Sequence, residues 1–190
     1  MLESIQNSER IPELFRAAIK TFPDDRGGFN SPFVASEIDK LTGSRFPVAQ
    51  TNQVINHRGS IRGYHVGPGR KLVYVTFGRI QVSYVDTRDM ASFGAVETFG
   101  LNANELVFVP DGVGNSYLAL EEGTICAYIT DVEWYLGIPS HVVNLFEPVP
   151  GVKTAWAIDR AECIYKSIDG TAPSLETLFP ERWARWKGSK

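Results

Sequence analysis

The feature that most constrains the fold is a two-residue period of apolar side chains that begins at about Phe46 and continues along most of the chain. In residues 71–77, for example, Val73 and Val75 would share one face of a strand and Leu72 would lie on the other. A period of two is typical of β-strands, whereas helices repeat every 3.6 residues. Further strands are predicted at 105–109, 115–120 and 124–130, separated by the turns Pro110-Asp111-Gly112 and Glu121-Glu122-Gly123. Many short strands joined by such turns predict an all-β sandwich or jelly roll.

Three further segments have recognisable local signals. Gly78-Arg79 interrupts the alternation before it resumes, so residues 71–86 are predicted to form a β-hairpin. Residues 11–19 fit either a short helix opened by proline or an extended arm. Ser174 is predicted to cap a helix that reaches Trp186.

Composition limits the size of the fold and the classes of partner. A chain of 190 residues with 43% apolar content can bury one good core, so we expect a single domain over residues 1–190. The formal charge is −3, and the basic residues are scattered among the acidic ones without forming a block. This gives no reason to expect nucleic acid as a partner. Cys126 and Cys163 lack metal-site or disulfide-framework spacing and are expected to be free thiols. With no signal peptide and no run of about 18 apolar residues, we expect a cytoplasmic protein without a membrane partner.

Residues 50–71 concentrate the polar side chains that suit catalysis. An imidazole (His65), a guanidinium (Arg62) and an ammonium (Lys71) lie between two strand-like runs. On neighbouring strands of one sheet they could face a single pocket, hold an anion and move a proton. This pattern indicates a site.

The motifs of the chain resemble, in order, those of the dTDP-4-dehydrorhamnose 3,5-epimerase family, from about Ile19 to Trp183. The quoted motifs are Asp25-Arg26-Gly27-Gly28-Phe29, which is similar to the family's Arg-Gly-x-Phe signature, Gln50-x-Asn52, Arg62-Gly63-Tyr64-His65, Lys71-Leu72-Val73, Val85-Asp86-Thr87-Arg88, Phe93-Gly94 and Val109-Pro110-Asp111-Gly112. Members of this family are cupin-type jelly rolls, also called double-stranded β-helices, that act on nucleotide-linked 4-keto-6-deoxy sugars. The resemblance implies the same fold, with an N-terminal arm (1–24), a C-terminal helical tail (170–190), short terminal helices and a homodimer with a swapped arm.

The implied reaction inverts a carbon beside a ketone, which requires a base, a partner for the enolate oxygen and an acid. By resemblance, His65 is the base and Asp169 is the carboxylate that orients it. Lys71 is the expected partner of the enolate oxygen, because an ammonium in a partly dry site stabilises an oxyanion strongly. Catalysis of this kind needs no cofactor.

The same resemblance implies a set of residues that bind the substrate. Arg26 and Arg62 would clamp the diphosphate, since the planar guanidinium matches phosphate oxygens. Phe29 would lie against the nucleotide base, reaching over from a neighbouring subunit. Gln50 and Asn52 would contact the nucleotide part.

The chain departs from the family pattern at three places. Ser31 replaces a glutamate that contacts the base, which leaves dTDP and CDP both open as the nucleotide. Asn115 replaces a second pocket histidine and can bind the substrate but cannot shuttle a proton at neutral pH. The family's acidic tyrosine aligns near residues 131–135, where counting from Tyr128 leads to Trp134 and leaves Tyr135 one residue away. A bulge would turn the Tyr135 phenol inward, whereas an unbroken strand would place the Trp134 indole there.

Because the sequence does not assign the acid, we expect a restricted epimerase that inverts carbon 3. Whether it also inverts carbon 5 stays open. Two alternatives also stay open: a non-catalytic jelly roll that binds a sugar nucleotide, and a 3,4-ketoisomerase. We expect no metal, because His57, His65 and His141 do not form the H-x-H pair of metal-binding cupins. The predicted setting is deoxy-sugar biosynthesis for O-antigen, lipopolysaccharide or a glycosylated natural product.

Overall fold

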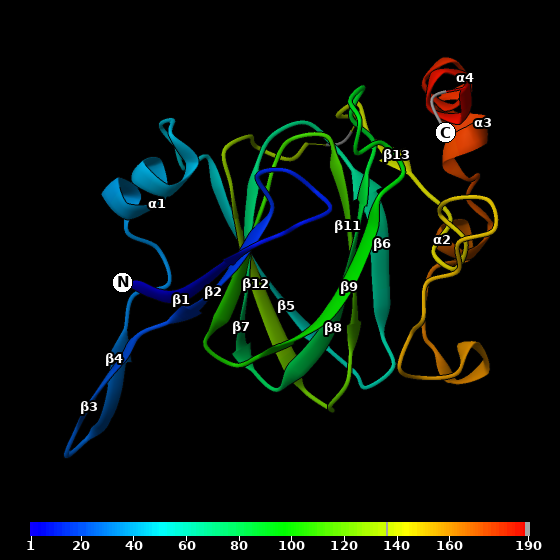
Figure 1. Ribbon diagram of the computed structural model, residues 1–190. Coiled ribbons are helices and arrows are strands. Elements are labelled where there is room, and N and C mark those ends of the chain that lie inside the picture. The colour runs from blue at the N-terminus through cyan, green and yellow to red at the C-terminus, as the bar shows by residue number, and fades with distance from the viewer. Residues whose placement is uncertain (136, 189–190) are drawn as a thin grey trace.

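A computed structural model describes residues 1–135 and 137–188 and shows two antiparallel β-sheets packed face to face (Figure 1). The six-stranded sheet contains, in spatial order, β1 (Leu2–Asn7), β2 (Phe15–Ile19), β10 (Glu105–Val109), β7 (Lys71–Phe77), β12 (Thr124–Thr130) and β5 (Gln50–Asn56). The five-stranded sheet contains β13 (His141–Val142), β6 (Ile61–Val66), β11 (Val113–Ala119), β8 (Arg79–Asp86) and β9 (Val96–Asn102). The predicted all-β sandwich is confirmed.

The remaining elements lie outside the sandwich. Near the N-terminus these are β3 (Thr21–Asp24), β4 (Gly27–Asn30) and helix α1 (Ala35–Thr42), and near the C-terminus they are the 3₁₀ turn η1 (Arg160–Glu162), α2 (Ser167–Thr171), α3 (Leu175–Leu178) and α4 (Pro180–Gly188). Figure 1 shows α1 beside the outer face of the six-stranded sheet and α2–α4 beside the five-stranded one. Among residues 1–135 and 137–188, every helix is too short or too polar to serve as a membrane span.

The predicted hairpin at residues 71–86 is wrong. Two strands do lie within residues 71–86, although Arg79, expected in the turn, begins β8. However, β7 pairs with β10 and β12, and β8 pairs with β9 and β11 in the other sheet. The chain crosses between the sheets at Gly78, whose φ is 78° and where an added Cβ would lie 2.5 Å from Oγ1 of Thr124. An alternating pattern predicts a strand without specifying its partner, so a crossing and a hairpin have the same sequence signal.

The N-terminal segment is extended, which decides between the two alternatives for residues 11–19. Strand β2 pairs with β1 and β10, and its side chains alternate between buried and half-buried. Most of the predicted arm (1–24) therefore belongs to the six-stranded sheet. The β3–β4 hairpin projects from the sandwich, and among the described strands β3 and β4 pair only with each other (Figure 1).

The predicted helix from Ser174 to Trp186 is two helices. Ser174 does occupy the N-cap position of α3, without a side-chain cap bond, but α3 ends at Leu178 and α4 begins at Pro180. Proline lacks an amide hydrogen and favours the first turn of a new helix, which accounts for the break.

Apolar side chains fill the space between the sheets and both outer faces. The interior cluster includes Val73, Val107 and Tyr84 and is closed by Ile11 and Leu14 from the β1–β2 loop. The outer cluster of the six-stranded sheet packs under α1, and two more clusters join the five-stranded sheet to the C-terminal segment. The interior between the sheets is mostly apolar, so polar side chains that face it are exceptions. Their position locates the candidate site.

Candidate active site

The register of the strands brings polar side chains together at one end of the inter-sheet space. Thr130 on β12 pairs with Lys71 on one side and with Gln50 on the other. In the five-stranded sheet, Asn115 on β11 pairs with His65 on β6. Residues directly opposite one another in a sheet point to the same face, so each row presents its polar groups together.

A β-bulge allows both Arg62 and His65 to serve this site. Two positions three residues apart normally lie on opposite faces of a strand. Here Arg62 pairs with Tyr117 and His65 pairs with Asn115, so three steps on β6 match two on β11. The extra residue of the bulge restores the shared face. Gly63 is required at this point, because its φ is 107° and an added Cβ would lie 2.3 Å from the Asn115 carbonyl oxygen.

His65 faces a buried carboxylate on helix α2. Its Nε2 lies 3.7 Å from Oδ1 of Asp169, and the imidazole is 51% exposed while the Asp169 side chain is 4% exposed. That carboxylate oxygen has no hydrogen-bond partner in the described chain. A buried carboxylate without donors is costly, so Asp169 favours the protonated imidazole. The structure thus brings His65 and Asp169 together, as predicted.

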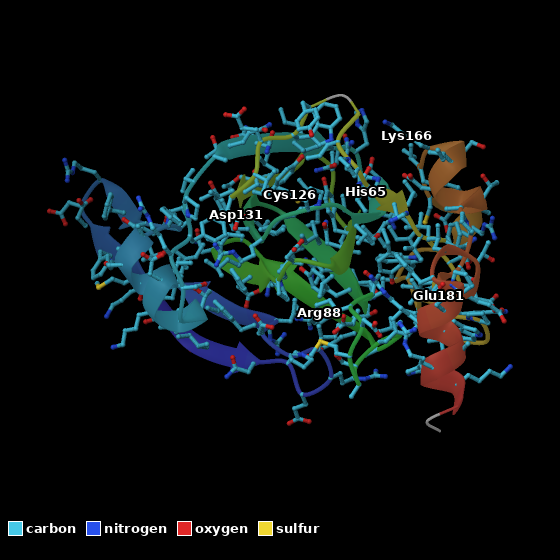
Figure 2. All side chains as sticks on the ribbon, turned by 90° about the horizontal axis from the view of Figure 1, so that it is seen from above. His65, Arg88, Cys126, Asp131, Lys166 and Glu181 are labelled. Atoms are coloured by element: carbon cyan, nitrogen blue, oxygen red, sulfur yellow. The ribbon has the colours of Figure 1, made fainter. Side chains whose placement is uncertain are left out.

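The half-exposed imidazole is still partly withdrawn from water, and this desolvation is the main cause that lowers the pKa of His65 below its usual range. The charges of Lys71 and Lys166 lower it further, and Asp169 opposes them. Figure 2 shows His65 between the interior of the sandwich, marked by Cys126, and Lys166 on the C-terminal segment. An imidazole held in this way is largely neutral near pH 7 and can accept a proton.

Lys71 crosses from one sheet to the other. Its Nζ donates a 3.0 Å hydrogen bond to Oδ1 of Asn115. Burial lowers the pKa of Lys71, and the charge of Asp111 opposes this shift. The ammonium therefore lies in a partly dry environment near His65, where it can stabilise an oxyanion.

Arg62 is fixed by a buried amide that the sequence did not reveal. Its Nε donates to Oδ1 of Asn56 at 3.0 Å, and the Tyr117 hydroxyl donates to the same oxygen at 3.2 Å. Asn56 is 2% exposed, and its Nδ2 donates to the backbone carbonyls of Val54 and Thr124. A strand-end asparagine followed by a turn carries no signal for this role, since the sequence does not show that Tyr117 and Arg62 converge on it.

Gln50 and Asn52 lie on β5 at the edge of the site. The Gln50 amide donates to Oδ1 of Asn52 at 2.7 Å, and its Oε1 accepts the backbone N–H of Trp134 at 2.7 Å. This second bond holds the segment after β12 against β5.

Neither of the two arrangements expected for residues 131–135 occurs. Strand β12 ends at Thr130, so there is neither a bulge nor an unbroken strand to orient Trp134 and Tyr135. Both side chains are exposed, at 66% and 57%. Asp131 explains the end of the strand, because its carboxylate accepts hydrogen bonds from the backbone and side chain of Arg70.

Arg26 and Phe29 do not join the other residues within one chain. Both lie on the β3–β4 hairpin, which projects away from β6 (Figure 1). The Arg26 side chain is 89% exposed and pairs with Asp24, and Phe29 is 66% exposed.

The other two histidines lie elsewhere. His57 pairs with Glu122 on an exposed turn at a distance of 2.7 Å, and the ring of His141 packs edge-on against Phe179. Within residues 1–135 and 137–188, no group of three or more His, Cys, Asp or Glu side chains converges as metal ligands would.

Comparison with known proteins identifies the family. The family model for dTDP-4-dehydrorhamnose 3,5-epimerase matches residues 8–177. The chain belongs to this family. It is 31% identical over 162 residues to a dTDP-4-dehydro-6-deoxyglucose 3-epimerase of Streptomyces bikiniensis, and the match covers 81% of this chain and 80% of that protein.

Solved structures of the family share the architecture. RmlC from Streptococcus suis, in complex with dTDP-D-xylose, superposes with a TM-score of 0.83 at 25% identity, covering 95% of this chain and 94% of that one. ChmJ, a 3′-monoepimerase from Streptomyces bikiniensis in complex with dTDP-quinovose, gives a TM-score of 0.78 at 26% identity, with 93% and 94% coverage. The predicted cupin-type jelly roll is confirmed, and the protein is a nucleotide-sugar epimerase of deoxy-sugar biosynthesis. The family assignment favours this activity over a non-catalytic binding protein or a 3,4-ketoisomerase.

Proposed function

We propose that this epimerase inverts carbon 3 of a dTDP-linked 4-keto-6-deoxyhexose. The pairing of His65 with the buried Asp169, opposite Lys71 on the facing sheet, is the observation that carries the proposal. Inversion at carbon 3 alone is supported by the exposed positions of Trp134 and Tyr135, beyond the end of β12, and by two relatives, at 31% and 30% identity, that are named 3-epimerases; a third relative at 30% identity is named a 3,5-epimerase. The dTDP carrier is supported by solved relatives that hold dTDP sugars.

In the proposed mechanism, His65 removes the proton from carbon 3. The electron pair of the broken C–H bond then forms the double bond between carbons 3 and 4, and the ketone becomes an enolate. Nδ1 is the ring nitrogen that faces the substrate, because Nε2 is directed at Asp169. The negative charge of Asp169 stabilises the imidazolium as it forms. The Lys71 ammonium stabilises the enolate oxygen that was the 4-keto group, and this lowers the barrier only because it acts on charge that develops in the transition state.

The remaining predicted residues bind the nucleotide diphosphate. Arg62, whose Nε is bound to Asn56, lies close enough to Tyr128 of the inter-sheet space for its charge to oppose the rise in the pKa of that phenol. Gln50, Asn52 and the exposed Trp134 lie beside one another at the entrance, where an indole can stack on a base.

The β3–β4 hairpin completes the site of a second copy of the chain. Its exposed Arg26 and Phe29 suit a phosphate and a base, and they lie on a hairpin that projects away from the β6 of their own chain (Figure 1). We therefore propose a homodimer in which each subunit supplies these two residues to the other. The free Cys126 and Cys163 fit a reducing cytoplasm, and the product would serve O-antigen or another glycosylated compound.

Incubation in heavy water with dTDP- and CDP-linked 4-keto-6-deoxyglucose, followed by NMR, tests this proposal. We expect deuterium and inverted geometry at carbon 3 of the dTDP sugar and no inversion at carbon 5. The His65→Ala variant should lose both exchange and inversion. Inverted, labelled carbon 5 would overturn the restriction to carbon 3, faster turnover of the CDP sugar would overturn the nucleotide, and binding without exchange would overturn catalysis.

A further inference from the structure

Inversion leaves one chemical role unfilled. After His65 removes a proton from one face of the sugar, an acid must return a proton to the opposite face. The base lies on β6 of the five-stranded sheet, so for a sugar held between the sheets the facing wall is the inner face of the six-stranded sheet, and the acid is sought there. The present inference rests on the proposed function and concerns this acid.

The seven tyrosines of the chain are the phenols that could supply the proton. Tyr84 and Tyr117 lie on the same sheet as His65, and the Tyr117 hydroxyl is committed to Asn56. Tyr64 is buried with its hydroxyl bonded to Ser83 and Thr154, in a cluster under the C-terminal helices. Two more tyrosines also lie outside the inter-sheet space. Tyr74 packs under α1, and Tyr165 belongs to the C-terminal segment. Tyr135 and Tyr128 remain.

Tyr128 lies on the correct wall and Tyr135 does not lie on either sheet. Tyr128 is on β12, where it pairs with Val73 on one side and with Asn52 on the other. It packs against the interior cluster, one row from Thr130 and Lys71. Its hydroxyl makes no hydrogen bond to any residue in the described ranges, so it is free to bond a substrate.

The surroundings of Tyr128 suit a group that gives up a proton and becomes an anion. Partial burial raises the pKa of Tyr128, and the positive charge of Arg62 opposes this shift. The phenol is therefore protonated at neutral pH, and the phenolate left after donation has a guanidinium nearby to stabilise it. Arg62 thus acts on the acid as well as on the diphosphate.

We propose that Tyr128 is the proton donor of the epimerase, acting from the wall opposite His65. The enolate double bond supplies the electron pair for the new C–H bond, the proton comes from the Tyr128 hydroxyl, and the C4–O bond returns to a ketone. Water then reprotonates the phenolate, and the imidazolium releases its proton to solvent. Atoms and charge balance without a co-reactant.

The Tyr128→Phe variant tests the proposal, with Tyr135→Phe as the matched control. Both changes remove one hydroxyl and keep the ring. In heavy water, Tyr128→Phe should form inverted product about 100-fold or more slowly than the unaltered enzyme. It should still exchange the carbon 3 proton of recovered substrate with retained geometry, because His65 can return a deuteron to the face it came from. Tyr135→Phe should turn over normally.

Three results would overturn the proposal: product formation by Tyr128→Phe within threefold of the unaltered enzyme, loss of exchange together with inversion while dTDP still binds, or a defect in Tyr135→Phe instead. Should Tyr128→Phe fail to fold, a fluorotyrosine placed at position 128 keeps the hydroxyl and makes it more acidic. It should move the alkaline limb of kcat/KM to lower pH, and an unmoved limb would count against Tyr128. An unaltered enzyme that shows no exchange would instead refute the proposed function.

Discussion

Replacement of Asp169 by asparagine should lower both the pKa of His65 and the catalytic rate by amounts that follow from the geometry. The Nε2–Oδ1 distance is 3.7 Å, and the imidazole is 51% exposed. At that separation the attraction between unit charges is about 1 kcal/mol in bulk water and about 4.5 kcal/mol at an effective dielectric constant of 20. A half-exposed ring lies between these limits, at about 2 kcal/mol, which corresponds to a factor of about 30 in an equilibrium constant.

The direction follows from the charge that is removed. Asp169 favours the imidazolium, so its loss lowers the pKa of His65 further below the ordinary value. The base then stays neutral to lower pH, and the acid limb of kcat/KM should move to lower pH. On the plateau, kcat/KM should fall by about 30-fold, because the imidazolium formed in the reaction has lost about 2 kcal/mol of stabilisation.

Two assays check this result together. The pH dependence of kcat/KM gives the acid limb, and an NMR titration of the imidazole Hε1 signals gives the pKa of His65 directly. Glu122→Gln is the matched control, since it removes the carboxylate beside the exposed His57 and should leave the titration of His65 unchanged. A pKa for His65 within 0.3 units of the unaltered value in Asp169→Asn would refute the reasoning.

Two further predictions follow from the site. Lys71→Ala should lower kcat about 100-fold or more, since losing one donor to an oxyanion costs about 3 kcal/mol; steady-state kinetics would check this, and near-normal turnover would remove Lys71 from the mechanism. The inactive variants Arg26→Ala and His65→Ala, mixed in equal amounts after unfolding and refolding, should regain about a quarter of the unaltered activity, because half of the dimers are mixed and each mixed dimer has one intact site. No recovery, with mixed dimers verified by mass spectrometry, would show that Arg26 does not act across subunits.

Several strands could be predicted from the sequence because their apolar side chains alternate between short turns, and β12 was predicted with its observed bounds. Their pairing could not, as the crossing at Gly78 shows: β7 and β8 alternate like the arms of a hairpin but belong to different sheets. Pro180 is a sequence signal for the break before α4, but the helical pattern on both sides of it favoured one continuous helix.

Site residues that belong to a family motif could be predicted from the sequence. Site residues that depend on contacts between distant strands could not. Resemblance placed Asp169 beside His65, although no property of the residues themselves links positions 104 residues apart. The inward direction of both Arg62 and His65 depends on the bulge at Gly63, and the glycine was the one available hint. Asn56 gave no signal, because its partners come from strands β6 and β11.

The pairing of β5 has a consequence for how the polypeptide acquires its structure. Within the part of the chain that the structure describes, this edge strand has β12 as its one strand partner, and its first residue, Gln50, is aligned with Thr130. During synthesis, β5 therefore has no partner strand until the chain has been extended through β12. Such non-local pairing slows folding and leaves a strand edge open to other chains in the meantime. Ribosome-stalled chains that stop before Thr124 should accordingly lack protection of the β5 amides, while those that extend past Thr130 acquire it.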